Sequence, residues 1–238
     1  MSPRSGPLVH VVGARPNFVK AAPVVRAVED QADHAQVLIH TGQHYDERMS
    51  DIFFHQLGLP RPDVDLGVGS GSHARQTAAL LPALEDQFVR LDPRLVVVYG
   101  DVNSTLAAAL VAAKLHTPVA HVEAGLRSFD NTMPEEINRR VTDSLSALHL
   151  VTSPEAIGHL AREGIAAAGI HFVGNPMIDT LLGNIERFDV SRARDAVGLD
   201  GAGAYGLVTL HRPANVDDPD AIAALVVALK EITGELPL

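Results

Sequence analysis

The chain has 238 residues, a formal net charge of −10 at pH 7 and no cysteine. The lack of cysteine excludes disulfides, thiolate zinc sites and a cysteine nucleophile, and the negative charge argues against nucleic acid and membrane surfaces as partners. No signal peptide is recognisable, and the apolar run at 106–115 is too short to span a bilayer and contains Lys114. We therefore expect a cytoplasmic protein.

Short apolar runs alternate with longer helical patterns from the start of the chain to about residue 175. The strands expected are Leu8–Val12, Gln36–His40, Leu95–Tyr99, Val119–Val122, Leu148–Thr152 and Ile170–Val173. The helices expected between them are Phe18–Asp30, Glu47–Leu57, His73–Arg90, Thr105–Leu115, Glu135–Ala147 and Pro154–Arg162. Strands that are apolar on both faces and joined by helical crossovers predict an α/β fold with a doubly wound parallel sheet, that is, a Rossmann-like domain.

The pattern changes after this domain, which we place at residues 1–175. Residues 176–204 are expected to form linker helices, and residues 205–238 begin a second Rossmann-like domain with a strand at Tyr205–Thr209 and a helix at Pro219–Thr233. One strand and one helix cannot bury both faces of a sheet. The sequence therefore predicts only the start of a second domain, cut short at its carboxyl end.

The first strand is followed by a turn that suits a phosphate group. Gly13 permits a sharp turn, and Arg15 and Lys20 place two cations near a helix N-terminus. Neither the dinucleotide fingerprint nor a P-loop is present. Ordinary solvated surface charges explain Arg15 and Lys20 equally well.

Three carboxylates, Asp101, Glu123 and Glu135, each follow an apolar run. The carboxyl ends of parallel strands form the ligand edge of an α/β sheet, so we expect these acids to converge there, with Arg127 as a cation beside Glu123. Two of the acids have a structural explanation when taken singly, Asp101 as a helix N-cap and Glu135 as compensation of a helix dipole, whereas Glu123, held beside a cation, is harder to explain in this way. Together they favour proton transfer or sugar binding.

Two loops that contain a histidine each follow an expected strand. Gln43 and His44 follow the second expected strand, and His211 and Arg212 follow the strand of the second domain. A polar loop residue is the alternative interpretation of His211. His121 and Glu123 match a fragment of the zinc-deaminase motif, but the cysteines which that motif requires are absent.

The chain resembles the non-hydrolysing UDP-N-acetylglucosamine 2-epimerases. The matching segments are GARPNFVKAAPV (13–24), TGQHYDERM (41–49), YGDVNST (99–105), HVEAGLRSFDNTMPEEINRRVTD (121–143), VGNPMIDTL (173–181) and VTLHRP (208–213). The resemblance implies a two-domain fold of the glycosyltransferase-B type and an isomerase that interconverts UDP-N-acetylglucosamine and UDP-N-acetylmannosamine. It implies elimination of UDP followed by its re-addition, with no metal or redox cofactor, in cell-surface polysaccharide biosynthesis.

The resemblance also implies roles for individual residues. The catalytic residues it implies are Asp101, Glu123, Glu135 and His211, and the substrate-binding residues are Arg15, Lys20, Gln43, His44, Arg127, Arg139 and Arg212. In bacterial members the loop that matches Gln43 and His44 binds a second substrate molecule as an activator. The partner expected is a UDP-sugar, and a homodimer is left open.

Other functions fit the same residues. A hydrolysing epimerase or a glycosyltransferase would share the fold, and a non-catalytic module would hold a sugar nucleotide without turnover. Family members continue well past residue 238, so we also expect the chain to be a fragment whose activity in isolation is in question.

Overall fold

The computed structural model describes residues 5–31, 34–42, 57–199, 203–210 and 213–237. Contacts within the chain divide it into two compact units, Met1–Glu186 and Arg187–Leu238, which are described separately.

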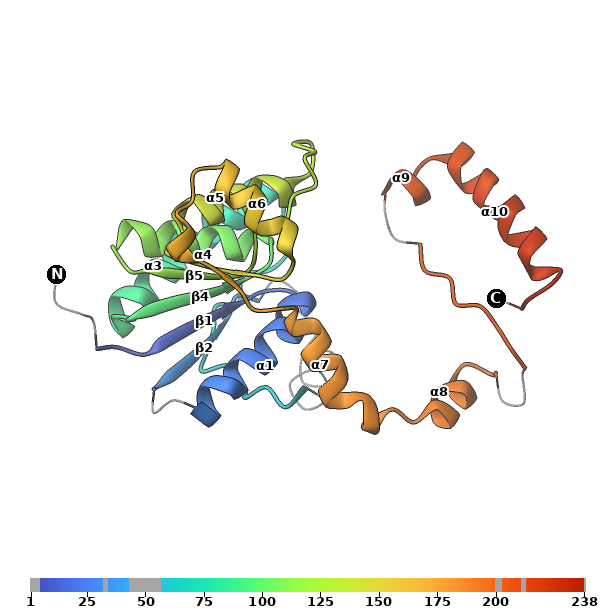
Figure 1. The fold of residues 1–238 in the computed structure, drawn as a ribbon, viewed down its shortest axis with the longest axis horizontal. Helices are drawn as coiled ribbons and strands as arrows, with labels where there is room; N and C mark the ends of the chain where they lie inside the picture. Colours follow the sequence, from blue (N-terminus) through green and yellow to red (C-terminus); the bar gives the residue numbers. More distant parts are fainter. Residues whose placement is uncertain (1–4, 32–33, 43–56, 200–202, 211–212, 238) are drawn as a thin grey trace. The chain divides into compact units, whose positions relative to one another are not determined.

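In its described part, the first unit is built on a seven-stranded, all-parallel sheet with the order β3-β2-β1-β4-β5-β6-β7 (Figure 1). The strands are β1 Leu8–Val12, β2 Gln36–His40, β3 Val64–Asp65, β4 Leu95–Tyr99, β5 Val119–Ala124, β6 Leu148–Val151 and β7 Ile170–Phe172. The order reverses between β1 and β4, where Leu8 is paired with Leu95. In such sheets the ligand crevice lies beyond the carboxyl ends of the strands on either side of this reversal.

Helices cover both faces of the sheet (Figure 1). They are α1 Arg15–Gln31, α3 His73–Leu91, α4 Asn103–Lys114, α5 Pro134–Leu145, α6 Pro154–Arg162 and α7 Pro176–Asn184, with short 3₁₀ turns at Ala167–Gly169 and Ile185–Arg187. Apolar residues of α3 and α4 pack on one face of the central strands, and those of α1 pack on the other. The doubly wound α/β class predicted from the sequence is confirmed.

The central strands of the sheet were predicted most accurately. β1, β2 and β4 have the predicted bounds, whereas β5 runs two residues further than expected, to Ala124. Strand β3 was missed because it has only two residues, too few to give an alternating pattern. The helix expected over 47–57 lies almost entirely outside the described residues.

The second unit contains helices α8 Val190–Ala196, α9 Pro213–Val216 and α10 Pro219–Thr233 in its described part. Helix α10 has its predicted bounds, and its N-cap, Asp218, accepts a hydrogen bond from the amide of Asp220. The strand predicted at Tyr205–Thr209 is wrong. A strand needs a ladder partner, and among the described residues this segment has none; Gly206 instead donates one backbone hydrogen bond to Pro237 O at 2.7 Å.

None of the described helices has the length and apolar character needed to cross a bilayer.

Candidate functional site

The candidate site is centred on Gly100, directly after β4. Gly100 has φ +63°, and its amide donates to Val122 O of the neighbouring strand at 3.0 Å. A Cβ atom here would lie 2.8 Å from Lys20 Nζ and 3.3 Å from Glu123 Oε2. The backbone conformation therefore favours glycine here, and the absence of a Cβ atom leaves room for the ends of these two side chains.

Glu123 lies at an irregularity near the end of β5. The register between β5 and β6 shifts between Val122 and Ala124, and Glu123 has φ +71°. A non-glycine residue in this region costs about 1–3 kcal/mol, and such strain concentrates at functional positions. The bulge places the carboxylate against Lys20, whose Nζ donates to Glu123 Oε2, with the two side chains only 9% and 14% exposed.

Asp101 is held by helix α5. Arg139 donates to Asp101 Oδ2 at 2.5 Å and to Glu136 Oε2 at 3.2 Å, and Asn138 Nδ2 donates to Asp101 O at 2.8 Å. The N-cap of α4 is Val102, so Asp101 does not serve as the cap that was its alternative explanation. Its carboxylate instead belongs to an ion pair at the carboxyl edge of the sheet.

Glu135 and Glu136 open α5 but have opposite environments. Glu136 is buried, and its Oε2 accepts from Ser128 N at 2.8 Å and from Ser128 Oγ at 3.1 Å. Burial by itself would raise the pKa of Glu136, but these hydrogen bonds and the one from Arg139 lower the pKa below its usual value. Glu135 is half-buried and has no hydrogen-bond or ion-pair partner among the described residues. The acid beside the candidate catalytic one is thus buried, not solvent-facing.

The turn after β1 is organised by Asn17, a residue that the sequence analysis passed over. Asn17 Oδ1 accepts from the amides of Gly13 and Ala14, both at 3.0 Å, and its Nδ2 donates to Tyr99 O at 2.8 Å. These amides are already bonded within the protein. Of the two cations expected to contact phosphate, Arg15 is exposed and Lys20 is buried beside Glu123.

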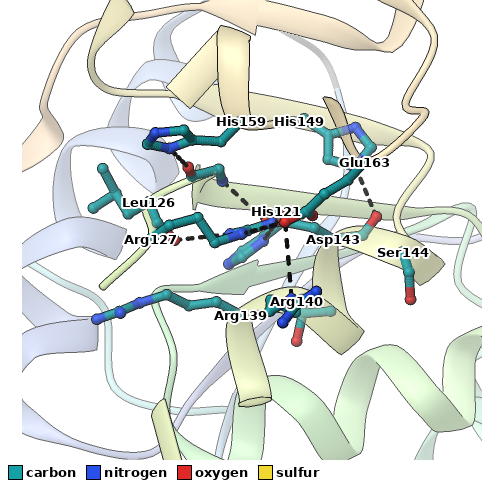
Figure 2. Close-up of polar contacts among 12 residues, drawn as sticks. His121, Leu126, Arg127, Arg139, Arg140, Asp143, Ser144, His149, His159 and Glu163 are labelled. Carbon is teal, nitrogen blue, oxygen red and sulfur yellow. Dashed lines mark hydrogen bonds and ion pairs between the residues drawn. The ribbon is translucent and has the colours of Figure 1, made fainter. Parts of the chain in front are cut away.

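Arg127 was expected to lie beside Glu123, but it does not. The cation beside Glu123 is Lys20. The guanidinium of Arg127 lies 2.7 Å from Asp143 Oδ2 and 2.6 Å from Glu163 Oε2, in a side chain that is 1% exposed (Figure 2). The prediction failed here because the loop after β5 turns this side chain back toward α5 and α6. A substrate-binding role for Arg127 stays a prediction.

The remaining predicted site residues, Gln43, His44, His211 and Arg212, lie outside the described residues, so their roles also stay predictions. Within the described ranges, no three His, Asp or Glu side chains form a group that could hold a metal ion. The structure brings Asp101, Glu123 and Glu135 to one edge of the sheet, together with Lys20 and Arg139.

Comparison with known proteins finds relatives along almost the whole chain. Residues 26–238 match the family model described as UDP-N-acetylglucosamine 2-epimerase. A Pseudomonas aeruginosa protein named UDP-2,3-diacetamido-2,3-dideoxy-D-glucuronate 2-epimerase is 45% identical over 227 residues, which cover 94% of this chain and 63% of that protein. The UDP-N-acetylglucosamine 2-epimerase of Methanocaldococcus jannaschii is 44% identical over 226 residues, with coverages of 93% and 61%.

Solved structures agree with these matches. The crystal structure of the Methanocaldococcus jannaschii UDP-GlcNAc 2-epimerase in complex with UDP-GlcNAc and UDP superposes with a TM-score of 0.86 at 42% identity, over 95% of this chain and 62% of that one. The Neisseria meningitidis enzyme bound to UDP-GlcNAc gives 0.85 at 27% identity, over 96% and 62%. The chain thus spans 61–63% of the length of these relatives.

A parallel, doubly wound sheet with acids and cations at its carboxyl edge is a Rossmann-like domain, and its superposition on the solved epimerase structures assigns it to the glycosyltransferase-B type. Within that class, the chain belongs to the UDP-N-acetylglucosamine 2-epimerase family, as its motifs had predicted.

Proposed function

We propose that the protein is a UDP-N-acetylhexosamine 2-epimerase that interconverts UDP-N-acetylglucosamine and UDP-N-acetylmannosamine. The observation that carries the proposal is the pairing of Lys20 with Glu123 beside Gly100, one residue before the Asp101–Arg139 ion pair. Two carboxylates and two cations thus line one sheet edge in a chain of this family. Methanocaldococcus jannaschii and Neisseria meningitidis relatives whose structures superpose on the chain are described as bound to UDP-GlcNAc.

The chemistry explains why acids and cations are needed together. The C2 proton of the sugar is not adjacent to a carbonyl, so simple deprotonation is too unfavourable. In the proposed reaction, a base removes this proton while the C1–O bond breaks, and the bonding electrons leave with UDP. The resulting 2-acetamidoglucal takes a proton on the opposite face of C2, and UDP adds back at C1. Carboxylates and cations that bind the separated charges stabilise the transition state more than the ground state.

The roles we propose follow from this separation of charge. Asp101, Glu123 and Glu135 supply the groups that remove and return the C2 proton, while Arg15, His211 and Arg212 accept the charge of the departing diphosphate. Gln43 and His44 bind a second UDP-sugar as an activator. These roles rest on the family's motifs together with the placement of the three acids at the carboxyl edge of the sheet.

A second substrate is favoured by a specific observation. The relative at 45% identity is named for UDP-2,3-diacetamido-2,3-dideoxy-D-glucuronate, which carries a carboxylate and a second acetamido group on the sugar. The reaction at C2 is the same for both sugars. Arg139 contacts Asp101 and Arg127 follows Glu123 in the chain, but both arginines are already in ion pairs, so we place UDP-N-acetylglucosamine first.

The test is to incubate the 238-residue chain with each UDP-sugar in D₂O. The proposal expects the C2-epimer to appear with deuterium at C2 and without accumulation of free UDP. Stoichiometric release of UDP would indicate a hydrolase instead. Binding of UDP by calorimetry with neither epimer nor deuterium would indicate a non-catalytic binding module, and faster turnover of the diacetamido sugar would change the assigned substrate.

A cytoplasmic location, a homodimeric state and a role in supplying precursors for cell-surface polysaccharides are also part of the proposal. They rest on the family's chemistry, since UDP-sugars are its substrates. Size-exclusion chromatography with light scattering tests the dimer, and a monomer at micromolar concentration would contradict it.

A further inference from the structure

His121 lies in the middle of β5 and is completely buried. Its Nε2 is 2.7 Å from Gly100 O, and its Nδ1 is 2.6 Å from Asp143 Oδ1 (Figure 2). The ring therefore bridges the turn that carries Asp101 and the acidic side chain of Asp143 in α5. None of the roles proposed above uses either His121 or Asp143.

Both contacts of the ring require His121 to donate. A backbone carbonyl oxygen can only accept, so Nε2 carries a proton. Asp143 is completely buried, and its Oδ2 accepts from the Gly125 amide and pairs with the Arg127 guanidinium, which together favour the ionised carboxylate. The ionised carboxylate also only accepts, so Nδ1 donates as well.

The second carboxylate oxygen of Asp143 contacts the residues that directly follow Glu123. Asp143 Oδ2 accepts from Gly125 N at 3.1 Å and from Arg127, whose guanidinium also pairs with Glu163. Gly125 follows Glu123 by two residues, and its own carbonyl receives a hydrogen bond of 2.9 Å from His159 Nδ1. His121, Asp143, Arg127 and Glu163 are thus joined by consecutive polar contacts, and Arg140 extends them through an ion pair with Glu163 at 3.8 Å.

We propose that His121 and Asp143 are positioning residues, which fix Gly100 O on one side and Gly125 N on the other and so set the separation of Asp101 and Glu123. The inference rests on the proposed epimerase function and extends it to two residues that do not touch the substrate. The pair acts as a unit because one oxygen of the carboxylate holds the imidazole while the other holds the loop after β5.

Two substitutions separate the two contacts of the ring. The amide nitrogen of His121→Gln reaches the place of Nε2 and retains the bond to Gly100 O, whereas that of His121→Asn matches Nδ1 and reaches only Asp143. We expect His121→Asn to lower kcat on the order of 10²-fold with KM little changed, and His121→Gln to stay within about tenfold of the parent. His149→Gln is the matched control, because His149 is equally buried, lies opposite His121 in β6 and contacts only backbone carbonyls, Gly169 O through Nδ1 and Asp143 O through Nε2; the Gln amide nitrogen takes the place of Nε2 and retains the bond to Asp143 O. We expect this control to retain the parental kcat.

A purely structural role would make both His121 variants lose stability and activity in parallel, and equal kcat values in folded Asn and Gln variants would overturn the inference.

A readout that needs no turnover separates this inference from the proposed function. In the ¹⁵N-labelled chain at neutral pH, we expect two slowly exchanging ring N–H signals that disappear in His121→Gln. We also expect the Gly125 amide to be protected from hydrogen exchange. This protection should be lost in Asp143→Asn but not in His149→Gln. A ring with one unprotonated nitrogen, or a Gly125 amide indifferent to Asp143, overturns the inference. If these signals are present but the chain forms no epimer, the proposed function fails, while the contacts by which His121 and Asp143 hold Gly100 O and Gly125 N are confirmed.

Discussion

The three candidate acids differ in what holds them in place. Glu123 is paired with Lys20, Asp101 with Arg139, and Glu135 has no polar partner among the described residues. A carboxylate without a local partner is available to interact with whatever enters the site. The neighbours of Asp101 and Glu123, by contrast, fix their orientation before a substrate arrives, which is the arrangement expected of groups that transfer protons.

The amide substitutions Asp101→Asn, Glu123→Gln and Glu135→Gln test the assignment. Each removes a proton-transfer group while keeping its shape, so we expect turnover of UDP-N-acetylglucosamine to fall by about 10²–10⁴. Initial rates of epimer formation at saturating substrate give the measurement. Glu155→Gln is the matched control, because Glu155 follows a proline in the first turn of α6, as Glu135 does in α5, but is exposed and, among the described residues, is not bonded to any of the three acids.

Near-parental turnover in all three variants, or an equal loss in the Glu155 control, would rule out the assignment.

Sequence alone predicted which acids gather at this edge, since each follows an apolar run. It did not predict their partners. Lys20 and Glu123 are 103 residues apart, and their contact depends on the turn at Gly100 and on the bulge at Glu123. No local pattern marks that bulge, which is why Arg127 was assigned to Glu123 by proximity in the chain.

At the level of elements, the end of β5 packs unusually tightly against α6. Gly125 has φ +78°, and a Cβ atom there would lie 2.8 Å from Ala156 O and 2.9 Å from Ala156 Cβ. The obstacle is backbone and a short side chain, neither of which can move aside cheaply. Because the same residue donates to Asp143, this contact also fixes the segment that carries Glu123.

Gly125→Ala should therefore destabilise the fold by about 2–4 kcal/mol, from overpacking and from the left-handed backbone. Gly158→Ala in α6 is the control, because Gly158 is an exposed helical residue with open space around it, and it should stabilise by about 0.5–1 kcal/mol. Urea unfolding followed by circular dichroism gives both values. A Gly125→Ala variant as stable as the parent would show that β5 and α6 can separate at little cost.

Elements were predictable where their pattern is self-contained. β1, β2 and β4 are apolar on both faces, and α10 begins with an N-cap followed by proline. The bounds of these elements could therefore be predicted from the sequence. Tyr205–Thr209 has the composition of a strand, but composition cannot supply a ladder partner. The extension of β5 to Ala124 was missed because it crosses the bulge.

For the molecule as a whole, the buried histidine of β1 gives stability a particular dependence on pH. Burial lowers the pKa of His10 from 6.5 to about 4, although a hydrogen bond with Gln36 opposes the shift. In the unfolded chain His10 becomes protonated below pH 6.5, whereas in the native protein it becomes protonated only below about pH 4. Stability should therefore fall as the pH is lowered through this interval, by about 3 kcal/mol.

Asp143 and Glu136 add to the loss at lower pH. The pKa values of both carboxyls are lowered in the folded protein, so their stabilisation is present above the ordinary carboxyl range and disappears as the pH falls through their folded values. Unfolding free energies measured by urea titration between about pH 7 and pH 2 should show the histidine phase first and the acid phase after it. His10→Gln should flatten that phase and leave the acid phase unchanged; an identical slope in both proteins would exclude His10 as its source.

The adjacency of β1 and β4 also constrains how the protein is made in the cell. Leu8 pairs with Leu95, so the amino-terminal strand leaves the ribosome long before its inner neighbour has been translated. During that interval an apolar strand edge is open to other nascent chains, a situation that favours misassembly and engages chaperones. Lys20 can pair with Glu123 only after a still longer segment has been translated. The Lys20–Glu123 pair of the candidate site therefore forms late in the synthesis of the chain.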